Sequence, residues 1–437
     1  MKPVVPPAHW LLGHYPSFKN DPIRFILDSA RDYGDFQQFK LLNKKIIFVN
    51  TPEAVKQVMQ TNYKTYVKSP GYHQLRHMSG MGIFTSDGEQ WINQRKMYHP
   101  AFTNDAIKSY FDLITQETNE MLESWKQSIN KNETINVSQS MMKVTMSVIT
   151  QSMFSQKIPY DSSIWNALTT CLEWVNNRSL RNPFIFPPKF PTAENRAFWK
   201  ARAELDNLVY SVISGRKAGE NKDDLLQRFM NPPEGIKKFS KEELRDELLT
   251  IFIAGHETTA NVMMWTFYSL LRHKEALTKA ANEAKTVSAQ FTFEDLRKLP
   301  YITNVLQEVM RLYPPVWHIG RVNTEEDEFF GHKIPVGTHV RIIPLALHRS
   351  ERLWENPNTF NPDRFTNITE DLTYQLIPFG AGPRLCAGRN FAMMEMMIIL
   401  VNILQQIDLS DFTVNDNEML PSTTLRTKFD VLIKRKI

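Results

Sequence analysis

The sequence is organised around residues 379–388, which read Phe-Gly-Ala-Gly-Pro-Arg-Leu-Cys-Ala-Gly. Cys386 in this stretch is one of only two cysteines in 437 residues. The surrounding glycines and proline favour tight turns and a close approach of the backbone to a bound group. A buried helix is predicted to open at Arg389, and a thiolate at a helix N-terminus beside an arginine is stabilised as the anion. Such a sulfur can serve as an axial ligand of iron; the alternative is a cysteine packed as a small apolar residue.

The length of 437 residues allows one large domain or two to three domains of ordinary size. Hydrophobic residues make up 42% of the chain and charged residues 23%, which predicts a large core and excludes a disordered chain. The net charge of +5 is spread along the sequence, so nucleic acid is not an expected partner. This mildly basic balance could suit an acidic protein partner or an anionic substrate, but the composition favours a solvated surface.

The two cysteines, Cys171 and Cys386, lie far apart in the sequence, and no CxxC pair is present. A disulfide framework is therefore not expected, and a reducing compartment fits. The N-terminal residues 1–7 are interrupted by prolines and lack the apolar run of a signal peptide. No window approaches the roughly 18 consecutive apolar residues that span a bilayer. We expect a soluble, cytoplasmic protein without a membrane span.

A second informative stretch, residues 254–259, lies inside a helix predicted over residues 242–271 and reads Ala-Gly-His-Glu-Thr-Thr. A polar cluster in an apolar helix costs stability unless it is satisfied, so it marks a candidate functional site. Ala254, Glu257 and Thr258 are spaced i, i+3, i+4 and share a face, from which His256 points away. The alternative is a helix kink with local hydroxyl-to-carbonyl bonds.

Three weaker patterns accompany these stretches. Trp91 and Arg95 are one helical turn apart and could both donate hydrogen bonds from one face. Glu308 and Arg311, spaced i, i+3, could pair, although this spacing usually gives a solvated ion pair. Arg364 follows in the stretch Phe-Asn-Pro-Asp-Arg-Phe at residues 360–365.

Local patterns also predict the surrounding structure. Residues 35–50 are predicted to form a β-hairpin, residues 52–60 a helix, and residues 340–343 a strand. Residues 68–88 are expected to be irregular, and residues 218–238 to form a loop. A stiff proline- and phenylalanine-rich turn is predicted at residues 182–191.

In spacing and identity, the cysteine stretch resembles the haem-binding loop of the cytochrome P-450 family, the haem-thiolate monooxygenases. Five positions carry this resemblance: Phe379, Gly382, Arg384, Cys386 and Gly388. Residues 254–259 resemble the oxygen-activation motif of the family, and Glu308 with Arg311 resembles its ExxR motif. The motifs occur in the order of the family across residues 6–435, with aspartate instead of the usual glutamate before Arg364. The chain begins at the proline-rich segment that follows the anchor of membrane-bound relatives, so it resembles a soluble bacterial type or a chain whose anchor is missing.

The resemblance implies one haem domain over residues 1–437, without a fused reductase. Its fold is predominantly α with a small β lobe (α+β), built from the N-terminal hairpin and the strand near Val340. Haem lies between the oxygen-activation helix and the helix after the cysteine loop.

The resemblance also implies roles for individual residues. Cys386 binds the iron of haem b, and Thr258 and Glu257 deliver protons during oxygen activation. Arg321 lies near a haem propionate, and Glu308, Arg311 and Arg364 support the fold and the haem loop. The full set of expected cofactor-binding residues is Cys386, Trp91, Arg95, Arg321, Arg384, Phe379, Gly388 and Ala254.

The substrate is less defined. Six residues are expected near it: Met78, Phe184, Val316, Trp317, His318 and Thr424. The pattern resembles soluble fatty-acid hydroxylases, and a terpenoid, a methyl ether or a methylated sugar remains open.

The implied reaction is insertion of one oxygen atom from O2 into a C–H bond, by hydroxylation or oxidative O-dealkylation. Electrons come from NAD(P)H through separate redox proteins, a ferredoxin or flavodoxin and its reductase, and the enzyme is expected to be a monomer. Two rivals are a haem-thiolate peroxygenase or isomerase, and a haem carrier or gas sensor. The Glu257–Thr258 pair disfavours the peroxygenase and the isomerase.

Overall fold

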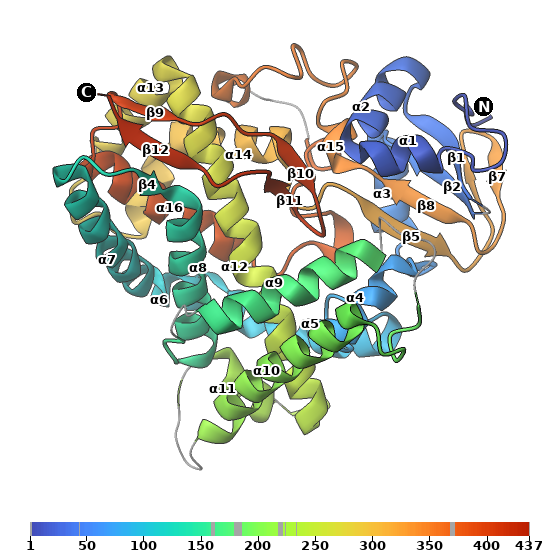
Figure 1. The fold of residues 1–437 in the computed structure, drawn as a ribbon, viewed down its shortest axis with the longest axis horizontal. Helices are drawn as coiled ribbons and strands as arrows, with labels where there is room; N and C mark the ends of the chain where they lie inside the picture. The colour runs from blue at the N-terminus through green and yellow to red at the C-terminus, as the bar shows by residue number, and fades with distance from the viewer. Residues whose placement is uncertain are drawn as a thin grey trace.

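The structure is a computed structural model that describes residues 2–42, 44–158, 162–178, 186–216, 222, 224–232, 234–367 and 372–436. Figure 1 shows helices that fill most of the molecule and a β-sheet at the N-terminal side. The predominantly α architecture with a small β lobe confirms the α+β fold expected from the sequence.

Helix α12 (Lys241–Arg272) runs through the middle of the molecule (Figure 1). A capping box opens it: the Glu243 backbone N–H donates to Ser240 Oγ at 3.1 Å, and the Ser240 N–H donates to the Glu243 carboxylate at 2.8 Å. This arrangement satisfies two of the otherwise unpaired N–H groups of the first turn. The helix is buried on most sides, which explains why no single face of its sequence is apolar.

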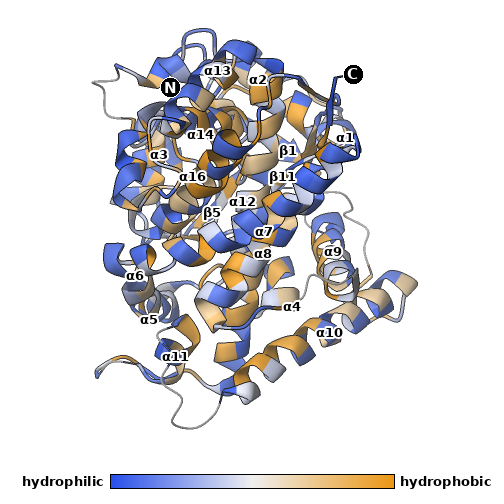
Figure 2. Ribbon diagram, turned by 90° about the vertical axis from the view of Figure 1, so that its left-hand side faces the viewer, coloured by the Kyte–Doolittle hydropathy of each residue, from blue (hydrophilic) through white to orange (hydrophobic). Residues whose placement is uncertain are grey.

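Other long helices surround α12 and complete the helical layer. Four of them contact it directly: α8 (Val137–Phe154), α10 (Ala193–Gly215), α14 (Pro300–Leu312) and α16 (Arg389–Gln406). Figure 2 shows hydrophobic residues gathered on interior helices such as α8, α14 and α16 and hydrophilic residues along the outline. The remaining α-helices are α1 (Tyr15–Asn20), α2 (Pro22–Tyr33), α3 (Pro52–Lys56), α4 (Gly71–Ser79), α5 (Gly88–Tyr98), α6 (Asn104–Ser109), α7 (Phe111–Asn130), α9 (Ser162–Asn176), α11 (Leu225–Met230), α13 (Lys274–Ala284) and α15 (Pro344–Leu347).

The β lobe is a five-stranded sheet with the order β1-β2-β8-β5-β3. The predicted hairpin is confirmed, because β1 and β2 pair antiparallel with Phe36 opposite Val49. The predicted strand near Val340 joins the same sheet, where it pairs parallel with β2 and places Ile47 opposite Val340. The strands are β1 (Phe36–Leu41), β2 (Lys44–Val49), β3 (Tyr66–Lys68), β5 (Ile319–Asn323) and β8 (His339–Ile342).

Three smaller sheets had no counterpart in the sequence predictions. One has the order β4-β12-β9 and brings the C-terminal strand β12 beside α8; the other two are the pairs β10-β11 and β6-β7. Their strands are short, so alternation of apolar residues gives little signal. The bounds are β4 (Ile135–Asn136), β6 (Asp327–Phe329), β7 (His332–Ile334), β9 (Phe412–Val414), β10 (Met419–Pro421), β11 (Leu425–Thr427) and β12 (Leu432–Arg435).

Two predicted irregular segments contain helices. Residues 68–88 include α4, because Gly71 and Gly80 stand at its ends rather than within it, and Gly80 terminates it with a φ of +64°. Residues 218–238 include α11, which begins after Asp224, whose carboxylate accepts a hydrogen bond from the Gln227 N–H at 2.8 Å. The predicted turn at 182–191 lies partly outside the described residues.

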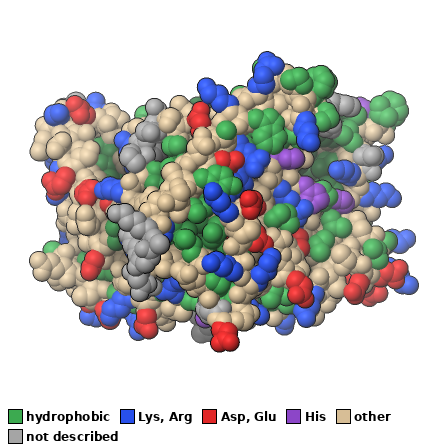
Figure 3. Space-filling model, turned by 90° about the horizontal axis from the view of Figure 1, so that it is seen from below, with side chains coloured by type: hydrophobic (Ala, Val, Ile, Leu, Met, Phe, Trp, Pro, Cys, Tyr) green, Lys and Arg blue, Asp and Glu red, His purple; other side chains and the backbone are tan. Residues whose placement is uncertain are grey.

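The surface seen from below mixes Lys and Arg side chains with Asp and Glu side chains (Figure 3). This face therefore lacks the single-sign basic field that nucleic-acid binding requires. Among the described residues, no helix combines the length and apolar character that crossing a membrane requires.

A buried ion-pair network ties α14 to the segment that leads to the cysteine loop. Arg311 donates two hydrogen bonds to Glu308, at 2.7 and 2.8 Å, and Arg364 donates a third at 3.0 Å. Both members of the α14 pair are 0% exposed, so this is not the solvated pair that i, i+3 spacing usually gives. Arg311 also donates to the carbonyls of His348 and Pro357 at 2.6 and 2.7 Å.

The network reaches the cysteine loop through His348. Its Nε2 accepts the backbone N–H of Ile377 at 2.9 Å, two residues before Phe379. The cysteine loop is therefore connected through His348 to the buried ion pairs of Glu308 with Arg311 and Arg364.

We predict that Glu308→Ala lowers the free energy of unfolding by about 3–5 kcal/mol, because it leaves the Arg311 guanidinium buried without its partner. Urea unfolding followed by circular dichroism measures this change. Glu123→Ala is the control, because Glu123 pairs with Lys126 on the surface, and it should leave stability nearly unchanged. Equal stability of the two variants would contradict the prediction.

Candidate active site

The cysteine loop is closed by its own backbone. The Cys386 N–H donates to the Phe379 carbonyl at 2.9 Å, and the Leu385 N–H donates to the Gly382 carbonyl at 3.0 Å. Gly382 has a φ of +66°, and a Cβ there would lie 2.0 Å from the Met59 carbonyl oxygen. Glycine is therefore required at this position both for the backbone conformation and for the close approach of the chain.

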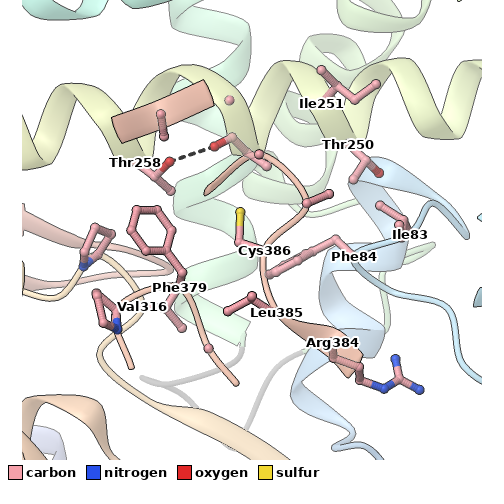
Figure 4. A pocket seen from close by; sticks show the side chains of 18 of the residues that line it. Ile83, Phe84, Thr250, Ile251, Thr258, Val316, Phe379, Arg384, Leu385 and Cys386 are labelled. Carbon is pink, nitrogen blue, oxygen red and sulfur yellow. Dashed lines mark hydrogen bonds between the residues drawn. The ribbon is translucent and has the colours of Figure 1, made fainter. Parts of the chain in front are cut away.

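Cys386 presents its sulfur to a cavity between this loop and α12 (Figure 4). The thiol is accessible from the cavity, and α16 begins three residues later. Burial raises the pKa of the Cys386 thiol, whereas the Gly388 N–H, Arg95 and Arg389 act in the opposite direction. The helix N-terminus and an arginine favour the thiolate as expected, but desolvation of the sulfur is the larger effect.

The cavity has a volume of about 310 Å³ and is largely apolar at its centre. The loop forms one wall and α12 the opposite wall (Figure 4). All expected cofactor-binding residues line this cavity: Trp91, Arg95, Ala254, Arg321, Phe379, Arg384, Cys386 and Gly388. Segments that are far apart in the sequence thus meet around one sulfur atom.

Cations that outnumber their carboxylate partners gather at one side of this cavity. Arg321 is 6% exposed, and its only hydrogen bond given by the structure is to its neighbour, the Gly320 carbonyl, at 2.9 Å. Arg384 pairs with Asp87 at 2.7 Å and lies over the Trp91 ring at 4.5 Å. This side therefore carries more positive than negative charge in a partly desolvated place, which calls for an anionic ligand.

Lys68 belongs to the same cluster, and sequence reasoning missed it. Its Nζ donates to the carbonyls of Ile83 and Ser86 at 3.1 and 2.5 Å. Burial, and next the charge of Arg384, lower the pKa of Lys68 to about 6. A single lysine at the end of a short strand carries no sequence signal, since only folding places it beside the arginines.

These features fit an iron porphyrin. A sulfur faces an apolar cavity from a loop shaped by glycine, which suits an axial thiolate ligand. The cation cluster of Lys68, Arg95, Arg321 and Arg384 suits the two carboxylates of a haem. The donor set of this cavity therefore matches both the metal and the anionic edge of the group.

Thr258 faces Cys386 across the cavity (Figure 4). Its hydroxyl donates to the Ala254 carbonyl at 2.8 Å, which is the local hydroxyl-to-carbonyl bond considered as the alternative reading of this motif. The helix nevertheless continues through this point from Lys241 to Arg272. A hydroxyl bonded only to a carbonyl of its own helix can rotate towards a ligand in the cavity.

Glu257 is 1% exposed and lies behind Thr258. One oxygen of its carboxylate accepts hydrogen bonds from Arg426 Nε and from Thr424 Oγ1, both at 2.6 Å. Burial alone would raise the pKa of Glu257, but Arg426 and Thr424 together hold it below its ordinary value. Arg426, which sequence reasoning missed, therefore keeps this carboxylate ionised.

A side cavity of about 130 Å³ adjoins the main cavity, and Thr258, Ala254 and Val316 line both. Three of the expected substrate residues line the side cavity: Val316, His318 and Thr424. Two others do not reach either cavity. Met78 is fully buried in the helical core, and Trp317 is 1% exposed and donates to the Ser422 carbonyl at 2.8 Å.

Alternation along the extended chain explains the position of Trp317. Residues 316 and 318 face the cavity, so the intervening side chain points to the opposite side. Phe184, the sixth expected substrate residue, lies outside the described residues.

Comparisons with known proteins agree with this site. A profile of the family described as Cytochrome P450 matches residues 3–433. Cyclooctat-9-en-7-ol 5-monooxygenase of Streptomyces melanosporofaciens is 30% identical over 90% of this chain and 86% of its own. Cytochrome P450 4A12B of Mus musculus is 27% identical over 97% of this chain and 87% of its own. A bifunctional cytochrome P450/NADPH–P450 reductase of Bacillus cereus is 26% identical over 96% of this chain and 41% of its own.

We predict that Gly382→Ala destabilises the protein by about 3 kcal/mol or more, because the new Cβ meets the Met59 carbonyl. Gly380→Ala is the matched control: its φ is +76°, but the nearest atom to a Cβ is 3.9 Å away, so only the backbone cost of about 1–2 kcal/mol applies. Thermal unfolding and haem content measure both variants. Equal losses would show that the contact with Met59 is unimportant.

We predict that the stability of the haem-free protein rises with pH between pH 7 and 9 because of Lys68. The pKa of Lys68 is about 6 in the folded chain and about 10.4 in the unfolded chain, so the unfolded chain binds one more proton in this range. The free energy of unfolding should rise by up to about 1.4 kcal/mol per pH unit, and Lys68→Met should remove this slope.

Urea unfolding at several pH values measures the slope. The control, Lys64→Met, changes an exposed lysine on the same segment and should keep the wild-type slope. A wild-type slope in the Lys68 variant would contradict the prediction.

Proposed function

The chain belongs to the cytochrome P450 family and is a cytochrome P450 monooxygenase, and we propose that it inserts one oxygen atom from O2 into a C–H bond of a small organic molecule. The single observation that carries this proposal is the position of the Thr258 hydroxyl opposite the Cys386 sulfur, with Glu257 behind it. A carrier or sensor has no use for a protonatable pair at this place.

Cys386 would hold the iron of haem b, and the cation cluster would hold its propionates. When bound, haem activates O2 and transfers one oxygen atom to the substrate, while the other leaves as water with two electrons and two protons. Phe379 and Ala254 line the cavity on the side of the cysteine loop and on the side of α12, respectively. The same chemistry next to an ether oxygen would give O-dealkylation.

The protein's own part in the reaction is to deliver protons. Glu257, kept ionised by Arg426, can accept a proton at its carboxylate oxygen and pass it towards Thr258 Oγ1, because both residues line the side cavity. The Thr258 hydroxyl then gives up its hydrogen bond to the Ala254 carbonyl and donates into the main cavity. Substitution of either residue should therefore separate electron consumption from product formation.

P450 enzymes receive their electrons from redox partners. We propose a separate ferredoxin or flavodoxin with an NAD(P)H-dependent reductase, and one haem domain over residues 1–437 that acts as a monomer. The cytoplasm is the proposed compartment, because Cys171 and Cys386 are both free thiols. A fatty acid is the first substrate to test, because apolar side chains such as Phe84, Ile251 and Val316 line the main cavity.

We predict that Thr258→Ala lowers the amount of product formed per NAD(P)H by about tenfold or more, because protons no longer reach the reacting oxygen in step with the electrons. The assay uses the holoenzyme with a surrogate ferredoxin and reductase, and with the saturated fatty acid that most strongly shifts the ferric haem spectrum. Thr258→Ser keeps a hydroxyl and is the matched control. Unchanged coupling in the alanine variant would refute the proton-delivery role.

A further inference from the structure

The side cavity contains a guanidinium that no described carboxylate neutralises. Arg341 on β8 lines this cavity, and its Nη1 donates to His318 Nδ1 at 3.0 Å. Because a guanidinium has only donors, Nδ1 accepts, and the imidazole proton resides on Nε2. Among the described residues, no ion pair joins Arg341 to Asp or Glu.

The electrostatic environment of Arg341 also indicates that its charge has no carboxylate partner. Burial lowers the pKa of Arg341, and the only neighbour acting in the opposite direction is the Tyr72 phenol. Burial, and next the charge of Arg341, lower the pKa of His318 to about 3, so the imidazole is neutral. Among the residues that the structure describes, Glu257 is the only carboxylate that lines the side cavity, and its charge is already paired with Arg426.

A second polar group in the same place has no partner. Ser69 is 2% exposed, lines the side cavity, and its hydroxyl makes no hydrogen bond in the structure. Ser69 and Arg341 lie against the same side of Gly320: a Cβ there would be 2.4 Å from Ser69 Oγ and 3.4 Å from Arg341 Cζ. A side chain at Gly320 would collide with Ser69, so glycine at this position allows the Ser69 hydroxyl to lie near the Arg341 guanidinium.

Strand register separates Arg341 from the cations that fit the haem. Gly320 on β5 is opposite Arg341, whereas Arg321 is opposite Val340 on β8 and Lys68 on β3. Neighbouring residues of a strand point to opposite faces, so Arg321 and Lys68 share one face and Arg341 lies on the other. The cavities agree, since Arg321 and Lys68 line the main cavity and Arg341 the side cavity.

We propose that this monooxygenase acts on carboxylic acids and that Arg341 and Ser69 bind the substrate carboxylate in the side cavity. The inference rests on the proposed monooxygenase function and names its substrate class. A planar guanidinium fork matches a carboxylate, and Ser69 Oγ supplies a further donor. The carbon chain then extends past Val316 and Thr258, which line both cavities, towards Cys386.

The test compares binding of saturated carboxylic acids of six to eighteen carbons with binding of their methyl esters. Affinity is measured on the holoenzyme by the ferric haem spectrum and, independently, by calorimetry. Wild type should bind the preferred acid about 10- to 100-fold more tightly than its ester. Arg341→Met should remove this preference by weakening only the acid, and Arg341→Lys should retain part of it.

Two further variants make the result specific. Ser69→Ala should weaken the acid several-fold and leave the ester unchanged, and it serves as the second probe of the site if Arg341→Met folds poorly. Arg24→Met changes an arginine whose side chain is 80% exposed and should behave as wild type.

The proposal is overturned if no acid binds, if acid and ester bind equally to wild type, or if Arg341→Met weakens both alike. The monooxygenase function fails separately: an Arg341-dependent preference for acids without any oxygenated product, when electrons are supplied, would leave the carboxylate site intact and refute the reaction.

Discussion

The site depends on one constraint: charge that is removed from water needs a partner. Cys386 sits where burial opposes its ionisation, and Lys68, Arg321 and Arg384 share a single nearby carboxylate, that of Asp87. By themselves these groups oppose folding, because each desolvated charge is costly. In the proposed function, haem would resolve both deficits together, because its iron would compensate the thiolate and its propionates would compensate the cations. The fully paired Glu308–Arg311–Arg364 network supports the loop independently of any bound group.

The β-sheet places these charged side chains on two opposite faces. Because side chains alternate along each strand, one face of β3 and β5 sends Lys68 and Arg321 to the main cavity, while the other face gathers Ser69, Gly320 and Arg341 at the side cavity. A shift of one residue in the register would exchange the two sets. The same alternation places the Trp317 side chain in the core, whereas the side chains of Val316 and His318 face the side cavity. The sheet therefore determines which arginine lines the main cavity, Arg321, and which lines the side cavity, Arg341.

Sequence alone predicted the parts that local chemistry determines. The cysteine loop, the polar cluster in α12 and the hairpin follow from glycine spacing, helical periodicity and alternation, and the structure contains all three. The joining of the hairpin and the strand near Val340 in one β lobe was implied by the family resemblance, and it is confirmed. What the sequence could not predict depends on contacts between distant segments. Lys68 and Arg426 become part of the site only through folding, and Arg341 is an ordinary strand residue until the register places it opposite a glycine. Helix α4 was missed because its glycines lie at its ends, where they terminate a helix instead of disrupting it.

Glu257 and Arg341 also show why recognition and proton delivery can share one small cavity. An unpaired carboxylate at position 257 would repel an anionic ligand and attract the guanidinium at position 341, which would collapse the site. Arg426 prevents both effects by pairing with Glu257 from the opposite side, and Thr424 holds the same oxygen. The neutral His318 occupies one donor of Arg341 without cancelling its charge. In the proposed function, the cavity would keep the charge of Arg341 for a ligand and the carboxylate of Glu257 for protons. The two roles would be independent, because His318 contacts Arg341 and Arg426 pairs with Glu257.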